Sequence, residues 1–259
     1  MRNKELKIPV LVYHYFGKDR NLQAGIEIQD LNYIVLRDDF MSHIRYLHEQ
    51  GYQAISFRQM MNARQGLEAL PPKPVILTFD DGHQSVYDFA IPILCKYKLQ
   101  AEIFVAPLKI GTSGYMSWNQ LEELVNEGFF IQSHTNSHVL LSKLSQDDIK
   151  YELVESKKGI ETRLNVTVTA LAVPMGGYPR ILKTIAREAG YKFVCTSYYG
   201  INSIDSDFLY LKRIMIKSPN DKINDLQDLL MSKSFLSFKM RIKNGYKSVS
   251  YTHLTLPTN

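Results

Sequence analysis

The sequence is poor in cysteine, which argues against the disulfide frameworks of small secreted proteins. Only two cysteines occur among 259 residues, without a Cys-x-x-Cys pair, so a thiolate zinc site is not supported either. Cys95 falls in a predicted helix and Cys195 in a predicted strand, and we expect both to be small core residues. The two thiols leave the redox compartment open.

Long apolar runs are missing as well. No stretch approaches the length of a membrane span, so we expect none. The positively charged start of the chain reaches Pro9 and a short strand without an apolar stretch of signal-peptide length. An upstream start, an unusual export route or an intracellular enzyme would each account for this pattern, and the localisation stays open.

The body of the chain carries no net positive charge. The formal net charge is +5, and residues 232–248 contain five basic and no acidic residues, so the remainder sums to zero. This distribution argues against nucleic acid as a partner. We expect 232–248 to be a basic, solvated C-terminal stretch that could touch an anionic surface. Residues 249–259 look like a translated sequencing adapter, which implies a non-native tail, a missing true C-terminus and no function for His253. The basic residues are Lys233, Lys239, Arg241, Lys243 and Lys247.

Strand and helix patterns alternate through the rest of the chain. This alternation predicts an α/β protein with one barrel of strands and helices. An open doubly wound sheet is disfavoured because no glycine-rich nucleotide fingerprint follows a strand. We expect the 14–37 stretch to be a loop, and Ser117 and Ser145 to cap helices. The predicted strands are 8–13, 75–79, 101–106, 128–133, 167–173, 191–196 and 210–216. The predicted helices are 39–48, 85–97 with a kink or restart at Pro92, 118–126, one from Ser145 through Leu164, 179–189 and 221–231.

Two acidic residues end an apolar run in the first half of the chain. The segment from Val75 to Phe79 is β-branched and aromatic, and Asp80, Asp81 and Gly82 follow it. It predicts a buried strand with both carboxylates at its C-terminal tip. Alone, an Asp-Asp-Gly sequence is more often a solvated turn than a catalytic pair.

Two histidines repeat this placement. His134 follows the apolar run 128–133, and His138 comes one helical turn or tight loop later. Two histidines at this spacing could also share an exposed helix face. Because the carboxyl ends of barrel strands carry active sites, the conjunction favours a metal site made of Asp, His and His. Zinc accepts such ligands, and three of them leave a position open for water.

Together these motifs resemble the polysaccharide deacetylase family, the metal-dependent esterases that include nodulation-factor, chitin and peptidoglycan deacetylases. The resemblance runs from about residue 8 to 216 and implies a single distorted (β/α) barrel of about seven strands, with a catalytic domain over 1–231. The first and fourth motifs look most like the branch that acts on poly-β-1,6-N-acetylglucosamine. In the family's order, the motifs are Val10-Leu-Val-Tyr-His14, Thr78-Phe-Asp-Asp-Gly82, His134-Thr-Asn-Ser-His138, Ala172-Val-Pro-Met-Gly176 and Leu211-Lys-Arg213-Ile.

The resemblance also implies roles for individual residues. Carried over by position, Asp80 is the general base, and the ligands of a divalent cation, zinc above all, are Asp81, His134 and His138. The backbone N–H of Met175 falls at the position that stabilises the negative charge on the carbonyl oxygen.

The chain departs from the family pattern at three positions. Ala172 stands where many members carry an arginine that pairs with the catalytic aspartate, and Met175 stands where they carry tyrosine. The late Leu-x-His motif that supplies the general acid has no histidine here. His14, at the end of the first strand, could fill that role or could be a buried, hydrogen-bonded ring that only packs. Arg213 could support the site or be an ordinary strand-end charge.

The activity that the resemblance implies is the metal-dependent hydrolysis of N-acetyl groups from N-acetylglucosamine residues of a cell-surface polysaccharide, with the Asp base activating a metal-bound water. Its partner is an acetylated amino-sugar polysaccharide or oligosaccharide, and the family suggests the cell envelope. Two alternatives stay open. One is an amidohydrolase for a small non-sugar amide. The other is a catalytically weak carbohydrate-binding relative, which the missing late histidine favours and the intact ligand set opposes.

Overall fold

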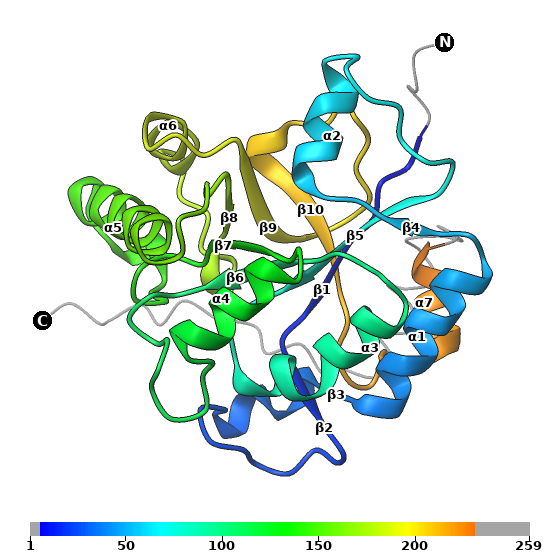
Figure 1. The fold of residues 1–259 in the computed structure, drawn as a ribbon. Helices are drawn as coiled ribbons and strands as arrows, with labels where there is room; N and C mark the ends of the chain where they lie inside the picture. Colours follow the sequence, from blue (N-terminus) through cyan, green and yellow to red (C-terminus); the bar gives the residue numbers. More distant parts are fainter. Residues whose placement is uncertain (1–5, 231–259) are drawn as a thin grey trace, which may run out of the picture.

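The computed structural model describes residues 6–230. Within this part of the chain, seven parallel strands form a closed barrel, because β1 pairs with both β5 and β10 (Figure 1). The predicted α/β barrel of about seven strands is therefore confirmed. The expected basic stretch 232–248 and tail 249–259 lie outside the described residues. Around the ring the strands are β1 (Val10–Tyr13), β10 (Leu211–Met215), β9 (Phe193–Tyr199), β8 (Ala170–Ala172), β7 (Phe130–Ser133), β6 (Glu102–Val105) and β5 (Pro74–Phe79), and β4 (Gln53–Ala54) flanks β5.

The pleat of the strands divides the apolar side chains between two cores. One cluster fills the barrel interior with alternate strand residues, such as Ile76, Phe104 and Phe193, which are fully or almost fully buried. The helix α2 (Phe57–Arg64) adds Phe57 to this interior cluster. The larger cluster joins the outward strand residues to six helices that surround the barrel (Figure 1), namely α1 (Arg37–Glu49), α3 (Ile91–Lys96), α4 (Trp118–Asn126), α5 (Gln146–Leu164), α6 (Leu182–Glu188) and α7 (Ile223–Leu230).

Side-chain caps begin three of these helices. The Ser117 hydroxyl accepts a hydrogen bond from the Gln120 backbone N–H, and the Gln120 side-chain oxygen accepts one from the Ser117 backbone N–H, as predicted. Ser145 likewise caps α5. Ser56 forms a second full capping box with Gln59 at the start of α2, a helix that was not predicted although the same Ser-x-x-Gln signal precedes it.

Two sequence predictions need correction, and a third is confirmed. The 14–37 stretch is not only a loop, because β2 (Tyr15–Gly17) and β3 (Ile34–Leu36) pair in parallel around a 3-10 helix, η1 (Ile28–Tyr33). The predicted helix 85–97 does restart at Pro92, which lies in the first turn of α3, and a π-helical turn, η2 (Val86–Ala90), precedes it. Cys95 is exposed, because α3 turns its neighbours Ile93 and Leu94 to the core, whereas Cys195 is buried as expected.

No helix among residues 6–230 combines the length and the apolar character that crossing a membrane requires.

Candidate metal centre

The residues of the candidate site follow the C-terminal ends of the barrel strands. Asp80 and Asp81 follow β5, and His134 follows β7. Asp80 continues the inward pleat of β5, whereas Asp81 and Gly82 take left-handed φ angles of 72° and 70° and turn the chain away. A Cβ on Gly82 would lie 3.0 Å from Val105, so only glycine fits this turn without displacement. The Asp-Asp-Gly sequence is thus a buried turn, with both carboxylates almost fully buried.

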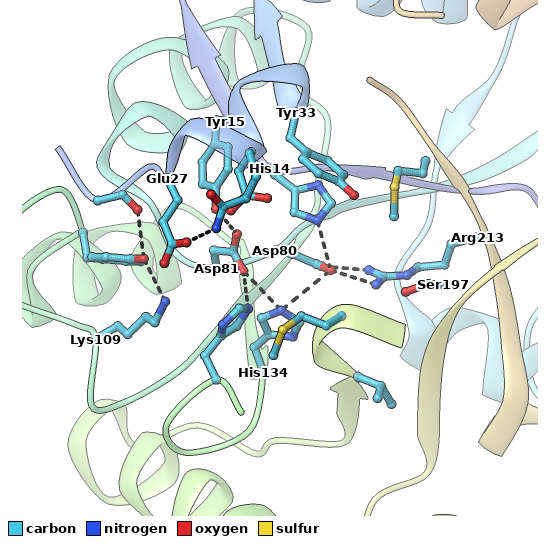
Figure 2. A pocket seen from close by; sticks show the side chains of 18 residues that line it. His14, Tyr15, Glu27, Tyr33, Asp80, Asp81, Lys109, His134, Ser197 and Arg213 are labelled. Carbon is cyan, nitrogen blue, oxygen red and sulfur yellow. Dashed lines mark hydrogen bonds and ion pairs between the residues drawn. The ribbon is translucent and has the colours of Figure 1, made fainter. Parts of the chain in front are cut away.

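Three ligand atoms converge at this turn. Asp81 Oδ1 lies 3.2 Å from His134 Nε2 and 3.0 Å from His138 Nε2, and these potential ligand atoms all lie within 4.8 Å of one another. The loop between the histidines is tight, with left-handed φ angles of 62° at Thr135 and 61° at His138. Figure 2 shows His134 directed at both aspartates.

Two observations show that this set fits a divalent cation. Among residues 6–230, no hydrogen-bond donor is recorded for the buried Oδ1 of Asp81, which faces the two imidazole nitrogens. His134 Nδ1 lies 2.9 Å from the carbonyl oxygen of Ala172, which can only accept, so Nδ1 carries the proton and Nε2 presents a lone pair. One carboxylate and two imidazoles are a ligand set that zinc-like cations accept, with a coordination position left open.

Electrostatics around Asp81 point the same way. Burial would raise the pKa of Asp81, but the facing His134 and His138 hold the pKa well below its ordinary value. Burial would lower the pKa of His134, whereas the charges of Asp80 and Asp81 raise it. The carboxylates therefore favour positive charge at this point, which a bound cation would supply in place of the proton on His134.

Tyr15 donates a hydrogen bond from its hydroxyl to Oδ2 of Asp81 at 2.7 Å (Figure 2). This contact was not predicted, because nothing in the sequence pattern tells which way Tyr15 faces.

Asp80 does not belong to the set of potential metal ligands and pairs with Arg213 instead. Arg213 Nη1 donates to Asp80 Oδ1 at 2.8 Å and Nη2 donates to Oδ2 at 2.7 Å (Figure 2). Both side chains are 2% exposed, so Arg213 is not an ordinary strand-end charge. Burial would raise the pKa of Asp80, but Arg213 and His134 hold it below its ordinary value. Arg213 on β10 thus forms the arginine–aspartate pair that Ala172 cannot form.

His14 and Arg213 approach Asp80 from different directions (Figure 2). Its Nε2 atom is 4.0 Å from Asp80 Oδ2, and its buried Nδ1 has no hydrogen-bond partner. Burial lowers the pKa of His14, against the opposing charges of Asp81 and Asp80.

Met175 lies on the wall of the same cavity, in the 3-10 turn η4 (Pro174–Gly176). Its φ of 53° is left-handed, which is uncommon for a side chain of this size and costs about 1 kcal/mol or more. The side chain is 62% exposed, and within residues 6–230 the structure records no hydrogen bond from its amide N–H.

All six predicted site residues line one cavity of about 640 Å³. Several lining residues were not predicted, because they come from loops, from the 3-10 helix η1 and from the end of β9, where no apolar periodicity marks a site. Tyr33 packs on His14 with ring centroids 4.8 Å apart, and Lys109 donates to the Tyr115 hydroxyl at 3.0 Å. The unpredicted lining side chains include Glu27, Asp30, Tyr33, Lys109, Tyr115 and Ser197.

Comparisons with known proteins show which proteins the chain resembles. A family model described as polysaccharide deacetylase matches residues 68–194. The Bacillus subtilis polysaccharide deacetylase homologue YxkH is 28% identical over 213 residues, which cover 82% of this chain and 72% of the relative. The structure of the Streptococcus pyogenes deacetylase PplD in complex with acetate superposes with a TM-score of 0.77 at 29% identity, over 87% of this chain and 98% of that one. The poly-beta-1,6-N-acetyl-D-glucosamine N-deacetylase of Staphylococcus aureus is 24% identical over 237 residues, covering 83% of this chain and 81% of the relative.

Proposed function

Because the chain belongs to the polysaccharide deacetylase family, we propose that it hydrolyses N-acetyl groups from N-acetylglucosamine residues of a cell-surface polysaccharide. The proposal depends on one observation, which is that two adjacent aspartates have different partners. Asp81 faces two imidazoles and presents an unsatisfied oxygen. Asp80 is held ionised by Arg213. Metal-dependent cleavage of an amide with water uses a cation and a base, and the turn after β5 presents a carboxylate for each.

Asp80 is the proposed base. A base must be ionised before it can accept a proton, and the pKa of Asp80 lies below its ordinary value. The two Arg213 bonds fix the carboxylate plane, so its remaining acceptor capacity faces the cavity. A zinc-like cation held by Asp81, His134 and His138 would supply Lewis acidity, which can lower the pKa of a coordinated water from 15.7 to roughly 7. Asp80 then accepts a proton from the attacking water.

Two further residues complete the proposed site. The unpaired N–H of Met175 donates to the carbonyl oxygen as negative charge develops there, which is worth about 3–4 kcal/mol. His14 is the proposed acid, because it lines the cavity next to Asp80. In its protonated form, which the charges of Asp81 and Asp80 favour against burial, it donates a proton to the leaving amine and then regains one from solvent. This assignment gives the chain a general acid although the late Leu-x-His motif lacks its histidine.

The proposed substrate is a β-1,6-linked polymer of N-acetylglucosamine. The name of the Staphylococcus aureus relative supports this linkage, as do the first and fourth motifs. A cavity of about 640 Å³ lies within the range of pockets for single small ligands, so one acetylated sugar residue fits at the site. Such a polymer places the proposed action in the cell envelope.

Acetate release tests the proposal. Purified protein with added zinc is incubated with β-1,6 and β-1,4 oligomers of N-acetylglucosamine, and free acetate is measured. We expect release that is faster on the β-1,6 oligomers and is abolished in Asp80→Asn and His134→Ala. Tyr151→Ala, an exposed change on α5, serves as the control and should retain full activity.

Three outcomes would contradict the proposal in distinct ways. Release from small non-sugar amides alone would favour the amidohydrolase alternative. Oligomer binding without any acetate release would favour a carbohydrate-binding relative. Faster release from β-1,4 oligomers would overturn the linkage while leaving the reaction in place.

A further inference from the structure

The two oxygens of Asp81 have different environments. Oδ1 faces His134 and His138, and no hydrogen-bond donor is recorded for it among residues 6–230. Oδ2 accepts the hydroxyl hydrogen of Tyr15 at 2.7 Å. Figure 2 shows Tyr15 and His134 approaching the Asp81 carboxylate from different elements. One oxygen is therefore available to a cation, and the other is already engaged.

A carboxylate in this place needs an external restraint. The terminal torsion of an aspartate has a broad, roughly twofold profile, so the side chain alone does not choose between its two oxygens. Asp81 also lies in a left-handed turn with φ of 72°, where no regular strand pairing holds it. The Tyr15 bond is the contact that fixes the rotation of the Asp81 carboxylate.

Tyr15 is itself held firmly against the segment that follows Asp81. Its backbone pairs with Ile34 in the β2–β3 ladder. The amide of the next residue, Phe16, donates to Ser85 Oγ at 2.9 Å. The Tyr15 ring packs edge-on to His83 at a centroid distance of 5.0 Å, and His83 Nδ1 is 2.8 Å from the same Ser85 hydroxyl. The hydroxyl of Tyr15 is thus pre-positioned by contacts that do not involve the ligand atoms.

We propose that Tyr15 is a positioning residue of the metal centre, whose hydroxyl holds Oδ2 so that Asp81 offers Oδ1 alone as a single ligand atom between the two imidazoles. This inference rests on the metal site of the proposed function. Partners of this kind orient the ligands that touch the metal, and their loss typically weakens metal affinity by about 10- to 100-fold. The 14–37 segment, expected to be only a loop, therefore contributes to metal binding through β2.

The variant Tyr15→Phe tests the proposal directly, because it keeps the ring that packs on His83 and removes only the hydroxyl. The zinc dissociation constant of the full chain is measured by competition with a chromophoric chelator, starting from metal-free protein. We expect an affinity about 10- to 100-fold weaker than that of the unsubstituted protein. Tyr191→Phe is the matched control, because Tyr191 is also buried and donates to the carbonyl oxygen of Leu153 at 2.8 Å, with no contact to a ligand.

A second variant tests the coupling and stays informative if Tyr15→Phe fails to fold. Ser85→Ala removes the acceptor of the Phe16 amide and should loosen the placement of the Tyr15 hydroxyl. We expect weaker zinc binding when Ser85→Ala is made alone and no additional loss when it is combined with Tyr15→Phe. A cobalt(II) absorption spectrum reports the coordination geometry, and it should change in Tyr15→Phe and not in Tyr191→Phe.

The outcomes separate this inference from the proposed function. Zinc affinity within about twofold of the unsubstituted value in both Tyr15→Phe and Ser85→Ala would overturn the positioning role, because the loss expected from an orienting partner is larger. No zinc binding by the unsubstituted protein would overturn the metal site together with this inference. Acetate release by the unsubstituted protein reports on the proposed reaction separately, whatever the affinity of the variants.

Discussion

Arg213 and Asp80 are 133 residues apart in sequence and form a buried ion pair joined by two hydrogen bonds. Arg213 also donates from Nε to the carbonyl oxygen of Thr196 at 3.0 Å, so the guanidinium is fixed to the barrel wall as well as to the carboxylate. A planar guanidinium can hold both carboxylate oxygens at once, whereas a lysine ammonium cannot. The pair therefore sets both the charge and the orientation of the proposed base.

Replacement of Arg213 should reduce activity and stability together. Arg213→Met leaves Asp80 buried without a partner, and we expect the free energy of unfolding to fall by about 3–5 kcal/mol. Arg213→Lys keeps the charge but loses the two-point geometry, and we expect kcat to fall roughly tenfold or more with a smaller loss of stability. Urea unfolding and acetate release measure the two effects. Full kcat in Arg213→Lys would show that the orientation of Asp80 does not depend on the guanidinium.

The sequence predicted the ligand set but not this pairing. Asp80, Asp81 and His134 follow apolar runs, and parallel strands bring their carboxyl ends together whatever the strand order, so the cluster could be predicted. The pairing of Arg213 with Asp80 depends on the closure of the barrel, which places β10 beside β1. No local sequence pattern encodes that closure. The sequence therefore left open whether Arg213 supports the site or is an ordinary strand-end charge.

The fold was predicted where periodicity was strong. Helices α4 and α5 were located by their caps and apolar stripes, and both begin where predicted. The short elements β2 and β3 have three residues each, which is too few for an alternating pattern to be recognised. The exposed position of Cys95 follows from the placement of α3 against the barrel, which residue type alone does not reveal.

Met175 should be replaceable without loss of activity, because its proposed donor is the main-chain N–H. Met175→Ala keeps that donor, and we expect kcat to stay within about threefold of the unsubstituted value. Met175→Gly also removes the strain of a left-handed side-chain residue, and we expect unfolding to become more difficult by about 0.5–1 kcal/mol. Acetate release and thermal unfolding measure these changes. A hundredfold loss in Met175→Ala would show that the Met175 side chain helps to place the substrate, because its thioether cannot donate a hydrogen bond to the oxyanion.

His14 can be tested through the leaving group. If His14 protonates the departing amine, His14→Ala should lower kcat on acetylated glucosamine oligomers by about 10²- to 10⁴-fold. An activated ester such as p-nitrophenyl acetate departs without protonation, so its hydrolysis by the same variant should be nearly unchanged. The ester is thus an internal control for folding and metal binding. Equal losses on both substrates would indicate that His14 does not act as the acid.

Glu102, a buried carboxyl outside the site, should make stability depend on pH. Glu102 lies at the start of β6 and accepts bonds from the Phe57 amide at 2.9 Å and from Gln132 Nε2 at 2.9 Å. Burial raises its pKa from 4.5 to about 7, although these two bonds oppose the shift. A group whose pKa is raised on folding binds its proton more tightly in the folded state. Its stabilising contribution is therefore complete below pH 4.5 and is lost as the pH rises to about 7.

The variant Glu102→Gln isolates this contribution, because glutamine cannot ionise and still offers one acceptor oxygen. Whatever its effect at pH 5, the variant should gain about 2–3 kcal/mol relative to the unsubstituted protein between pH 5 and pH 8, since one pKa unit corresponds to about 1.4 kcal/mol. Urea unfolding of both proteins at the two pH values gives this difference directly, and shared pH effects of all other groups cancel. A difference that does not change with pH would mean that Glu102 stays ionised throughout, stabilised by the amide of Phe57 at the start of α2.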